Sequence, residues 1–242
     1  MKVTLTFDNG PTAATAEVLD ILHSRGVKST FFVIASQLAE PSARALTERA
    51  SSEGHWIGNH TLTHNIQFGD APADLSLPNR EIGGAESLIG DLAQPVKLFR
   101  PYAGGGVLGP RVFSATAIDY LQRHNYTCVL WSSIPHDWDQ PDQWVQRCLD
   151  DIDRQDWSVV VIHDLPTGAM RHLPMFLDTL ANRGVEIVQD IPESYTPIRN
   201  GTLLAGLEAL TTATRSGGAG LPDRARPQRH GRRDTSDRDH PR

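Results

Sequence analysis

The chain has 242 residues and a formal net charge of -6 at pH 7; 39% of its residues are hydrophobic and 21% are charged. This composition is ordinary for a soluble globular protein, and the length suits one large domain. No apolar run approaches the roughly 18 residues that a membrane-spanning helix needs, so we expect no membrane partner. The excess of acidic residues disfavours nucleic acid or another polyanion as a partner.

The sequence indicates neither a secretory signal nor a disulfide. Residues 3–7 alternate like a strand, without the apolar stretch and small-residue cleavage site of a signal peptide. We therefore expect a cytoplasmic protein. Cys128 and Cys148 lack C-x-x-C spacing, and in a reducing compartment we expect them to be buried thiols.

The last 29 residues differ in composition from the rest of the chain. Residues 214–242 contain eight Arg and four Asp, a local charge of +4, which leaves -10 on the preceding residues. They are rich in Gly and Pro and lack aromatic residues, which predicts a disordered tail after a domain at 1–213. Because the arginines alternate with Asp and have no aromatic partners, we do not expect the tail to bind nucleic acid.

Strand and helix patterns alternate along the chain. In order, they predict a strand at 3–8, a helix at 14–25, a strand at 29–34, a helix at 41–53, a strand at 55–60, a helix at 79–92, a strand at 96–100, a helix at 114–124, a strand at 126–131, a helix at 141–154, a strand at 158–162, a helix at 173–182 and a strand at 185–188. Residues 68–78 and the Ala-Gly-Gly-Gly run at 103–106 predict loops. Residues 191–200 predict an irregular closing segment, and 202–212 a weak last helix.

This alternation predicts an α/β protein with about seven parallel strands. Regular strand-helix repeats place the strands in one parallel sheet, and seven such units favour a (β/α) barrel over an open doubly wound sheet. The doubly wound alternative also lacks a Gly-x-Gly-x-x-Gly run after the first strand.

Two histidines four residues apart, His60 and His64, follow the third predicted strand. On one face of a helical turn, such a pair can bind one divalent cation. Zinc proteases with this spacing carry a Glu directly after the first His as general base, whereas this chain has Thr61. If a metal assists hydrolysis here, the base must come from another segment.

Polar or aromatic residues also stand where other predicted strands end. They are Asp8 and Asn9, His60, Arg100, Trp131, and His163 with Asp164. In a parallel barrel the C-terminal ends of all strands open onto one face, where active sites lie. The joint pattern predicts one cleft with the residues of a metal-dependent hydrolase.

Five segments of the sequence resemble the ordered motifs of one family. They are Thr6–Pro11, His60–His64, Phe99–Tyr102, Asp137–Trp138 and Val161–Asp164. The chain resembles the polysaccharide deacetylase family, the NodB-homology carbohydrate esterases of family 4, over about Lys2–Ile198. The resemblance implies a distorted (β/α) barrel and metal-dependent removal of acetyl groups from acetylated sugars, closest in type to cytoplasmic chitooligosaccharide deacetylases.

The resemblance also implies a role for each motif residue. His60, His64 and Asn9 would hold a divalent metal, zinc foremost, with cobalt, nickel or manganese as alternatives. Asp8 would be the base that deprotonates water, and Arg100 would orient it.

His163 would protonate the departing amine, with Asp137 fixing its orientation. The backbone N–H of Tyr102 resembles the family's oxyanion donor. Pro101, Trp131 and Trp138 would contact the substrate.

The chain departs from the family pattern at three positions. Asn9 stands where the family usually has a second Asp as metal ligand. A neutral amide oxygen is a weaker ligand than a carboxylate, so either the metal affinity falls or Asn9 acts through water while the two histidines hold the cation. The third motif lacks an extra Pro after Arg100. Ile134 stands where the fourth motif usually carries an earlier Asp.

These features favour deacetylation of N-acetylglucosamine-containing oligosaccharides, with an acetylated oligosaccharide as the partner. Two alternatives stay open. One is an amide hydrolase like the allantoinase-related members of the same fold. The other, suggested by Asn9, is a carbohydrate-binding protein with a degenerate site.

Overall fold

The structure is a computed structural model that describes residues 1–93, 96–204 and 206–212. The predicted tail at 214–242 and the end of the predicted domain at residue 213 lie outside these residues. In the described part of the chain, no helix has the length and apolar character needed to span a membrane.

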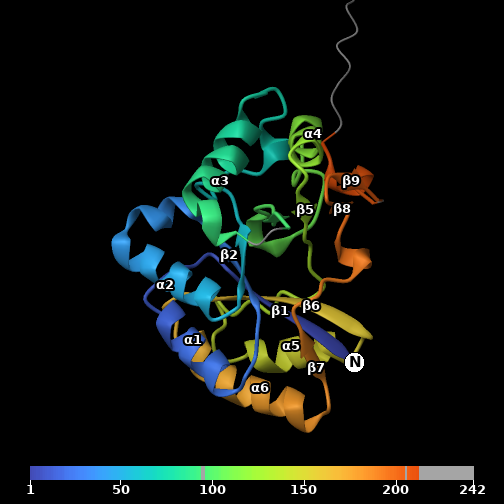
Figure 1. Ribbon diagram of the computed structural model, residues 1–242. Helices are drawn as coiled ribbons and strands as arrows, with labels where there is room; N and C mark the ends of the chain where they lie inside the picture. The colour runs from blue at the N-terminus through green and yellow to red at the C-terminus, as the bar shows by residue number, and fades with distance from the viewer. Residues whose placement is uncertain (94–95, 205, 213–242) are drawn as a thin grey trace, which may run out of the picture.

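The described elements follow the predicted alternation of strand and helix (Figure 1). The strands are β1 Lys2–Asp8, β2 Thr30–Val33, β3 Trp56–Asn59, β4 Leu98–Phe99, β5 Thr127–Cys128, β6 Trp157–His163, β7 Glu186–Val188, β8 Ile198–Arg199 and β9 Thr202–Leu203. The α-helices are α1 Thr15–Ser24, α2 Pro41–Ser52, α3 Gly84–Ile89, α4 Ala115–Arg123, α5 Trp144–Ile152 and α6 Leu173–Asn182.

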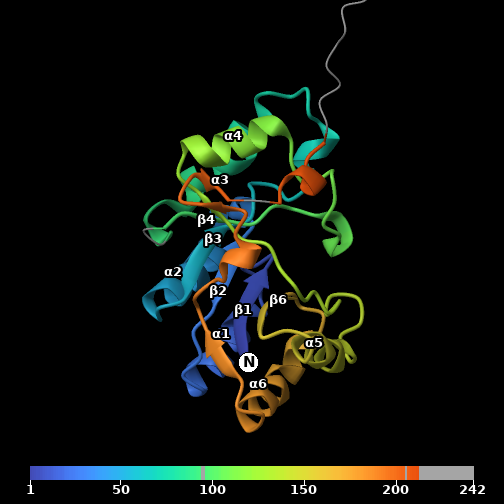
Figure 2. The same ribbon diagram turned by 90° about the vertical axis from the view of Figure 1, so that its right-hand side faces the viewer.

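The strands form one curled sheet in the order β6-β1-β2-β3-β4-β5-β8-β9. The pairs among β1 to β7 are parallel, and β7 pairs with the first half of β1 while β2 pairs with its second half. A bridge between Ser133 and Val160 brings the chain after β5 alongside β6. With the helices on the outside (Figures 1 and 2), this is the predicted distorted (β/α) barrel.

Along β1, successive side chains face opposite sides of the sheet, which separates the residues of the apolar core from those on the inner side of the barrel. Val3, Leu5 and Phe7 are buried in the apolar core that β1 shares with the inner faces of α1 and α6. The intervening Thr6 and Asp8 are also buried but reach Arg100. Asp8 therefore ends the strand on the inner side of the barrel.

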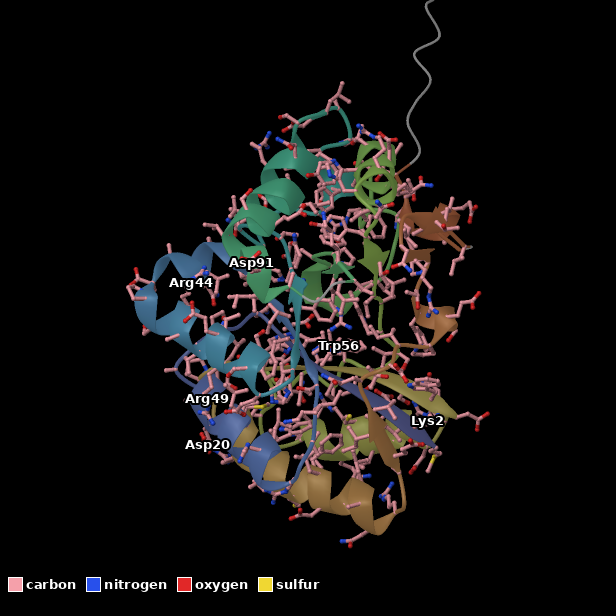
Figure 3. The ribbon with its side chains drawn as sticks, viewed as in Figure 1. Lys2, Asp20, Arg44, Arg49, Trp56 and Asp91 are labelled. Atoms are coloured by element: carbon pink, nitrogen blue, oxygen red, sulfur yellow. The ribbon has the colours of Figure 1, made fainter. Side chains whose placement is uncertain are left out.

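The helices are also tied to one another on the outer surface. Arg49 on α2 donates to Asp20 on α1 with an Nη2–Oδ1 distance of 2.6 Å, and both side chains are visible in Figure 3. Cys128 and Cys148 are buried free thiols, as predicted.

Two predicted helices differ from the structure in position or type. The predicted helix at 141–154 begins at Trp144 instead of Pro141, after a turn. The predicted helix at 79–92 is a π-turn, then α3, then a 3₁₀ turn. Gly83 and Gly84 allow this segment to pack closely, because a β-carbon on either would press against Tyr120 or Leu62.

The last predicted helix, at 202–212, is wrong. These residues form β9 and a short 3₁₀ turn, and β8 lies within the segment predicted to be irregular. Asn200 and Gly201, with φ of 48° and 75°, make the two-residue turn of a β8–β9 hairpin. Ile198 then pairs with Cys128, which extends the sheet by two antiparallel strands.

A buried histidine at the start of β3 gives a testable pH dependence. Burial lowers the pKa of His55 to about 4, and its Nδ1 accepts a hydrogen bond from the Ser29 N–H at 3.1 Å. As the pH falls below 6.5, His55 becomes protonated in the unfolded chain before it does in the folded protein. Folding stability therefore falls as the pH drops towards 4. We expect His55→Asn to reduce this acid-side loss by on the order of 2 kcal/mol, measured by urea unfolding between pH 4 and 7.

Candidate active site

The C-terminal ends of the parallel strands surround one cleft with a volume of about 230 Å³. It is lined by Asp8, Asn9, His60, His64, Pro101, Tyr102, Trp131, Trp138 and His163, together with Ala103, Gly105, Gly106, Ile134, Val161 and Leu165. Arg100 and Asp137 are fully buried behind this lining. The structure thus brings together the residues that the sequence placed at one site, except Asp164, whose side chain does not line the cleft.

The two histidines of the second motif lie side by side, but not on a helix. Their ring centroids are 4.5 Å apart. The turn after β3 is irregular, with Thr61 and His64 at φ of 68° and 56°. The Thr61 N–H donates to Asn59 Oδ1 and the His64 N–H donates to Thr61 Oγ1, each at 2.9 Å. The helical turn expected from the spacing is therefore wrong, and a hydrogen-bonded left-handed turn pairs the rings instead.

Both imidazoles are held in the neutral form that binds metals. Burial lowers the pKa of each ring to about 3. His60 Nδ1 donates to the carbonyl oxygen of Arg100 at 2.9 Å, which leaves the lone pair of Nε2 free. A backbone partner of this kind fixes the tautomer and the orientation of a metal-ligating His.

Asn9 lines the same cleft as these rings. It has a φ of 70°, and its backbone carbonyl accepts from Gln37 Nε2 at 3.1 Å. Its Oδ1 is buried without a hydrogen-bond partner among the described residues. Two neutral imidazoles and an unpaired amide oxygen suit a borderline divalent cation. The described residues contain no cluster of three or more His, Cys, Asp or Glu with the geometry of a metal site.

Asp8 is held between Arg100 and His60. Arg100 Nη1 donates to Asp8 Oδ1 at 2.7 Å and to Thr6 Oγ1 at 2.6 Å, while Asp8 Oδ2 is 3.6 Å from His60 Nε2. Burial lowers the pKa of Arg100, and the carboxylate of Asp8 opposes that shift. The guanidinium also packs on the ring of Phe32, so Asp8 has a fixed, charged partner.

His163 and Asp137 form a second hydrogen-bonded pair at the site. Asp137 accepts from His163 Nδ1 at 2.9 Å and from the His163 backbone N–H at 2.8 Å. Burial lowers the pKa of His163, but the hydrogen bond and charge of Asp137 outweigh it, so the pKa lies above its ordinary value. Trp138 packs edge-on against the His163 ring.

The glycine-rich loop forms the remaining wall of the cleft. The Tyr102 ring packs on His64, and among the described residues its backbone N–H makes no hydrogen bond. Trp131 Nε1 donates to the carbonyl of Gly106, which has a φ of 73° and leaves no room for a β-carbon beside Ile134. Glycine is therefore required at position 106, where this loop contacts Trp131 and Ile134.

Several supporting residues were not predicted from the sequence. Glu81 accepts from the Thr63 N–H and hydroxyl and so holds the turn that carries the two histidines. Thr6 contacts Arg100, and only its place two residues before Asp8 on the same strand face could have indicated it. Ile134, at which the fourth motif departs from the family pattern, lines the cleft, and Asp8 is the carboxylate that pairs with Arg100.

The sequence matches the polysaccharide deacetylase family over residues 1–129. It is 31% identical over 206 residues to a chitooligosaccharide deacetylase of Bradyrhizobium sp., an alignment that covers 77% of this chain and 87% of the relative. It is also 31% identical over 192 residues to YheN of Bacillus subtilis. That alignment covers 75% of this chain but 64% of YheN, so the chain spans slightly less than two thirds of that relative.

Solved structures with the same fold include two carbohydrate esterases of family 4. One is an enzyme from Streptomyces lividans in complex with acetate, with a TM-score of 0.66 and 26% identity, covering 81% of this chain and 95% of that chain. The other is an acetyl xylan esterase from Clostridium thermocellum in complex with a cobalt ion, with a TM-score of 0.63 and 26% identity. It covers 78% of this chain and 87% of that chain.

Proposed function

Because this chain belongs to the polysaccharide deacetylase family, we propose that it is a divalent-metal-dependent hydrolase of N-acetylglucosamine-containing oligosaccharides. Water would add to the acetyl carbon, the carbon–nitrogen bond would break, and acetate and a free amine would leave. The observation that supports the proposal is that His60, His64 and Asn9 line the same cleft as Asp8, which pairs with Arg100, and His163, which pairs with Asp137.

The two pairs suit opposite proton transfers. Asp8, which accepts a hydrogen bond from Arg100, takes the proton of the attacking water, and His163, whose pKa Asp137 raises, returns a proton to the departing nitrogen. The N–H of Tyr102 donates to the carbonyl oxygen as that oxygen gains charge, a contribution of about 3 kcal/mol for a typical donor.

The donor set supports a metal held by His60, His64 and Asn9. When bound, a divalent cation polarises the acetyl carbonyl and lowers the pKa of the attacking water. The imidazole nitrogens suit zinc, cobalt or nickel, and an amide oxygen also suits manganese. The Clostridium thermocellum esterase is in complex with a cobalt ion, and cobalt is one of the metals that imidazole nitrogens suit.

If Asn9 is a ligand, a carboxylate at this position binds the cation more tightly. We expect Asn9→Asp to lower the dissociation constant for zinc or cobalt by about tenfold or more, because a charged oxygen replaces a neutral one. Calorimetric titration of metal-stripped protein measures this constant. Asn65→Asp is the matched control, because Asn65 is exposed next to His64 and outside the cleft. An equal gain in both variants would assign the effect to net charge and remove Asn9 from the ligand set.

A substrate panel separates the proposed reaction from its alternatives. Mass spectrometry after incubation with N-acetylglucosamine oligomers, acetylated xylo-oligosaccharides and allantoin reports which bond is cleaved. We expect loss of acetyl groups from the N-acetylglucosamine oligomers. Cleavage of allantoin alone would favour the amide hydrolases. Oligomer binding without turnover, in protein shown to hold metal, would favour a carbohydrate-binding role.

A further inference from the structure

Asp164 lies directly behind the site, and none of the steps above uses it. It follows His163 at the end of β6, but its side chain lies on the opposite side of the sheet from the cleft. It is fully buried and borders a cavity of about 10 Å³ beneath Gly10 and Pro11, which is too small for a substrate. Asp164 therefore has no route to the reacting atoms.

Asp164 joins two of the loops that border the site. Thr15 Oγ1 donates to Asp164 Oδ2, and Thr12 Oγ1 donates to the Asp164 carbonyl. The Thr12 N–H donates in turn to Thr15 Oγ1 at 2.8 Å. These bonds connect the end of β6 to the loop between β1 and α1, which carries Asn9.

The carboxyl group also fixes the path of the backbone beside Asn9. A β-carbon on Gly10 would overlap both carboxyl oxygens of Asp164, so the two groups are in tight contact. The regular pairing of β1 with β6 ends at Asp8 and His163. Beyond that pair, the bonds of Asp164 to Thr12 and Thr15 join the two loops in the described part of the chain.

Burying an acid here is costly. Burial raises the pKa of Asp164 to about 6, and its Oδ1 has no hydrogen-bond partner among the described residues. A buried oxygen left unpaired opposes folding. A group kept at such a cost at the edge of a site indicates a role in the site's geometry.

We propose that Asp164 is a positioning residue that clamps the Asn9–Gly10 segment to the end of β6. The clamp sets the position of Asp8 and Asn9 relative to His163. Its catalytic consequence rests on the proposed function, because it matters only if these residues act together. A displacement of about 1 Å at a catalytic site can cost about 100-fold in rate.

Three variants separate position from charge. Asp164→Ala removes the carboxyl contacts. Asp164→Asn keeps the shape and the acceptor for Thr15 Oγ1 but removes the charge. Thr15→Val removes the hydroxyl that links Thr12 to Asp164, and Thr30→Val is its matched control, because Thr30 is equally buried and its hydroxyl has no partner among the described residues.

Amide hydrogen exchange of residues 9–13 reports whether the clamp is intact, and the measurement needs no substrate. We expect faster exchange in Asp164→Ala and Thr15→Val, and wild-type exchange in Thr30→Val. In the first two variants cobalt affinity should fall by about tenfold, and kcat by about 10- to 100-fold with KM within about twofold. Asp164→Asn should stay within about threefold of wild type.

Each readout has an outcome that overturns the proposal. Unchanged exchange in Asp164→Ala and Thr15→Val would do so, as would faster exchange without loss of cobalt affinity. An Asp164→Asn variant as defective as Asp164→Ala would show that charge matters and position does not. If the wild type releases no acetate, the proposed function fails, while exchange and cobalt titration still report on the clamp. Thr15→Val keeps the test available if Asp164→Ala does not fold.

Discussion

Replacing Asp8 by Asn is expected to lower acetate release by about 1000-fold or more while a divalent cation still binds. The amide keeps the shape of the side chain and can still accept from Arg100 Nη1. It cannot take a proton from water, and general-base catalysis is typically worth 10²- to 10⁴-fold. Steady-state kinetics with N-acetylglucosamine oligomers and cobalt titration of the same preparation measure both results.

This substitution also removes the charged partner of a buried arginine, so stability must be followed in parallel. Breaking a buried ion pair from one side costs about 3 kcal/mol or more. Thr6→Val is a useful comparison, because it disturbs the same Arg100 Nη1 without altering the cleft lining. We expect it to destabilise the fold but to lose less than about tenfold in rate. Activity of Asp8→Asn near that of wild type would exclude Asp8 as the base.

Replacing His163 by Ala is expected to lower kcat for N-acetylated sugars by about 10²- to 10⁴-fold. An amine must be protonated as it leaves, whereas 4-nitrophenolate leaves without a proton. The loss with 4-nitrophenyl acetate should therefore be much smaller than the loss with an N-acetylglucosamine oligomer. Equal losses with the two substrates would contradict the role of His163 as the general acid.

Asp137→Ala is expected to change the pH dependence of kcat/KM, because Asp137 acts on the pKa of His163. Asp137 raises the pKa of His163 against the effect of burial, so removing it lets that pKa fall. The acid must be protonated to act, so the alkaline limb of kcat/KM moves to lower pH. A pH profile of the variant with an unmoved alkaline limb would mean that another group donates the proton.

The arrangement of the cleft was predictable from the sequence because parallel topology fixes it. Once β1 and β6 are parallel neighbours, residues at their C-terminal ends must be adjacent, and Asp8 pairs in register with His163. The same reasoning placed Arg100 directly after β4, and it placed Trp131 at the cleft although β5 ends earlier than predicted, at Cys128.

Local geometry was less predictable where left-handed residues decide it. The four-residue spacing of His60 and His64 suggested a helical turn, but Thr61 and His64 adopt positive φ and side-chain hydrogen bonds close the turn. The hairpin at Asn200–Gly201 carried a recognisable turn signal that the apolar pattern of 202–212 obscured.

The buried unpaired atoms could not have been predicted from sequence spacing. The isolation of Asn9 Oδ1 depends on the fold of the loop after β1, and the burial of Asp164 depends on the contact that Thr15, at the start of α1, makes with this residue. Both are long-range results of packing, and no local pattern encodes them. They are also the two features on which the metal site and the clamp rest.

Metal-dependent acetate release is the measurement that tests the proposed function most directly. Metal-stripped protein should release no acetate from N-acetylglucosamine oligomers, and activity should return in proportion to added zinc, cobalt or manganese until one equivalent is bound. Full activity in the metal-stripped protein would contradict metal-dependent deacetylation. So would the absence of acetate release from every oligomer when one equivalent of metal is bound.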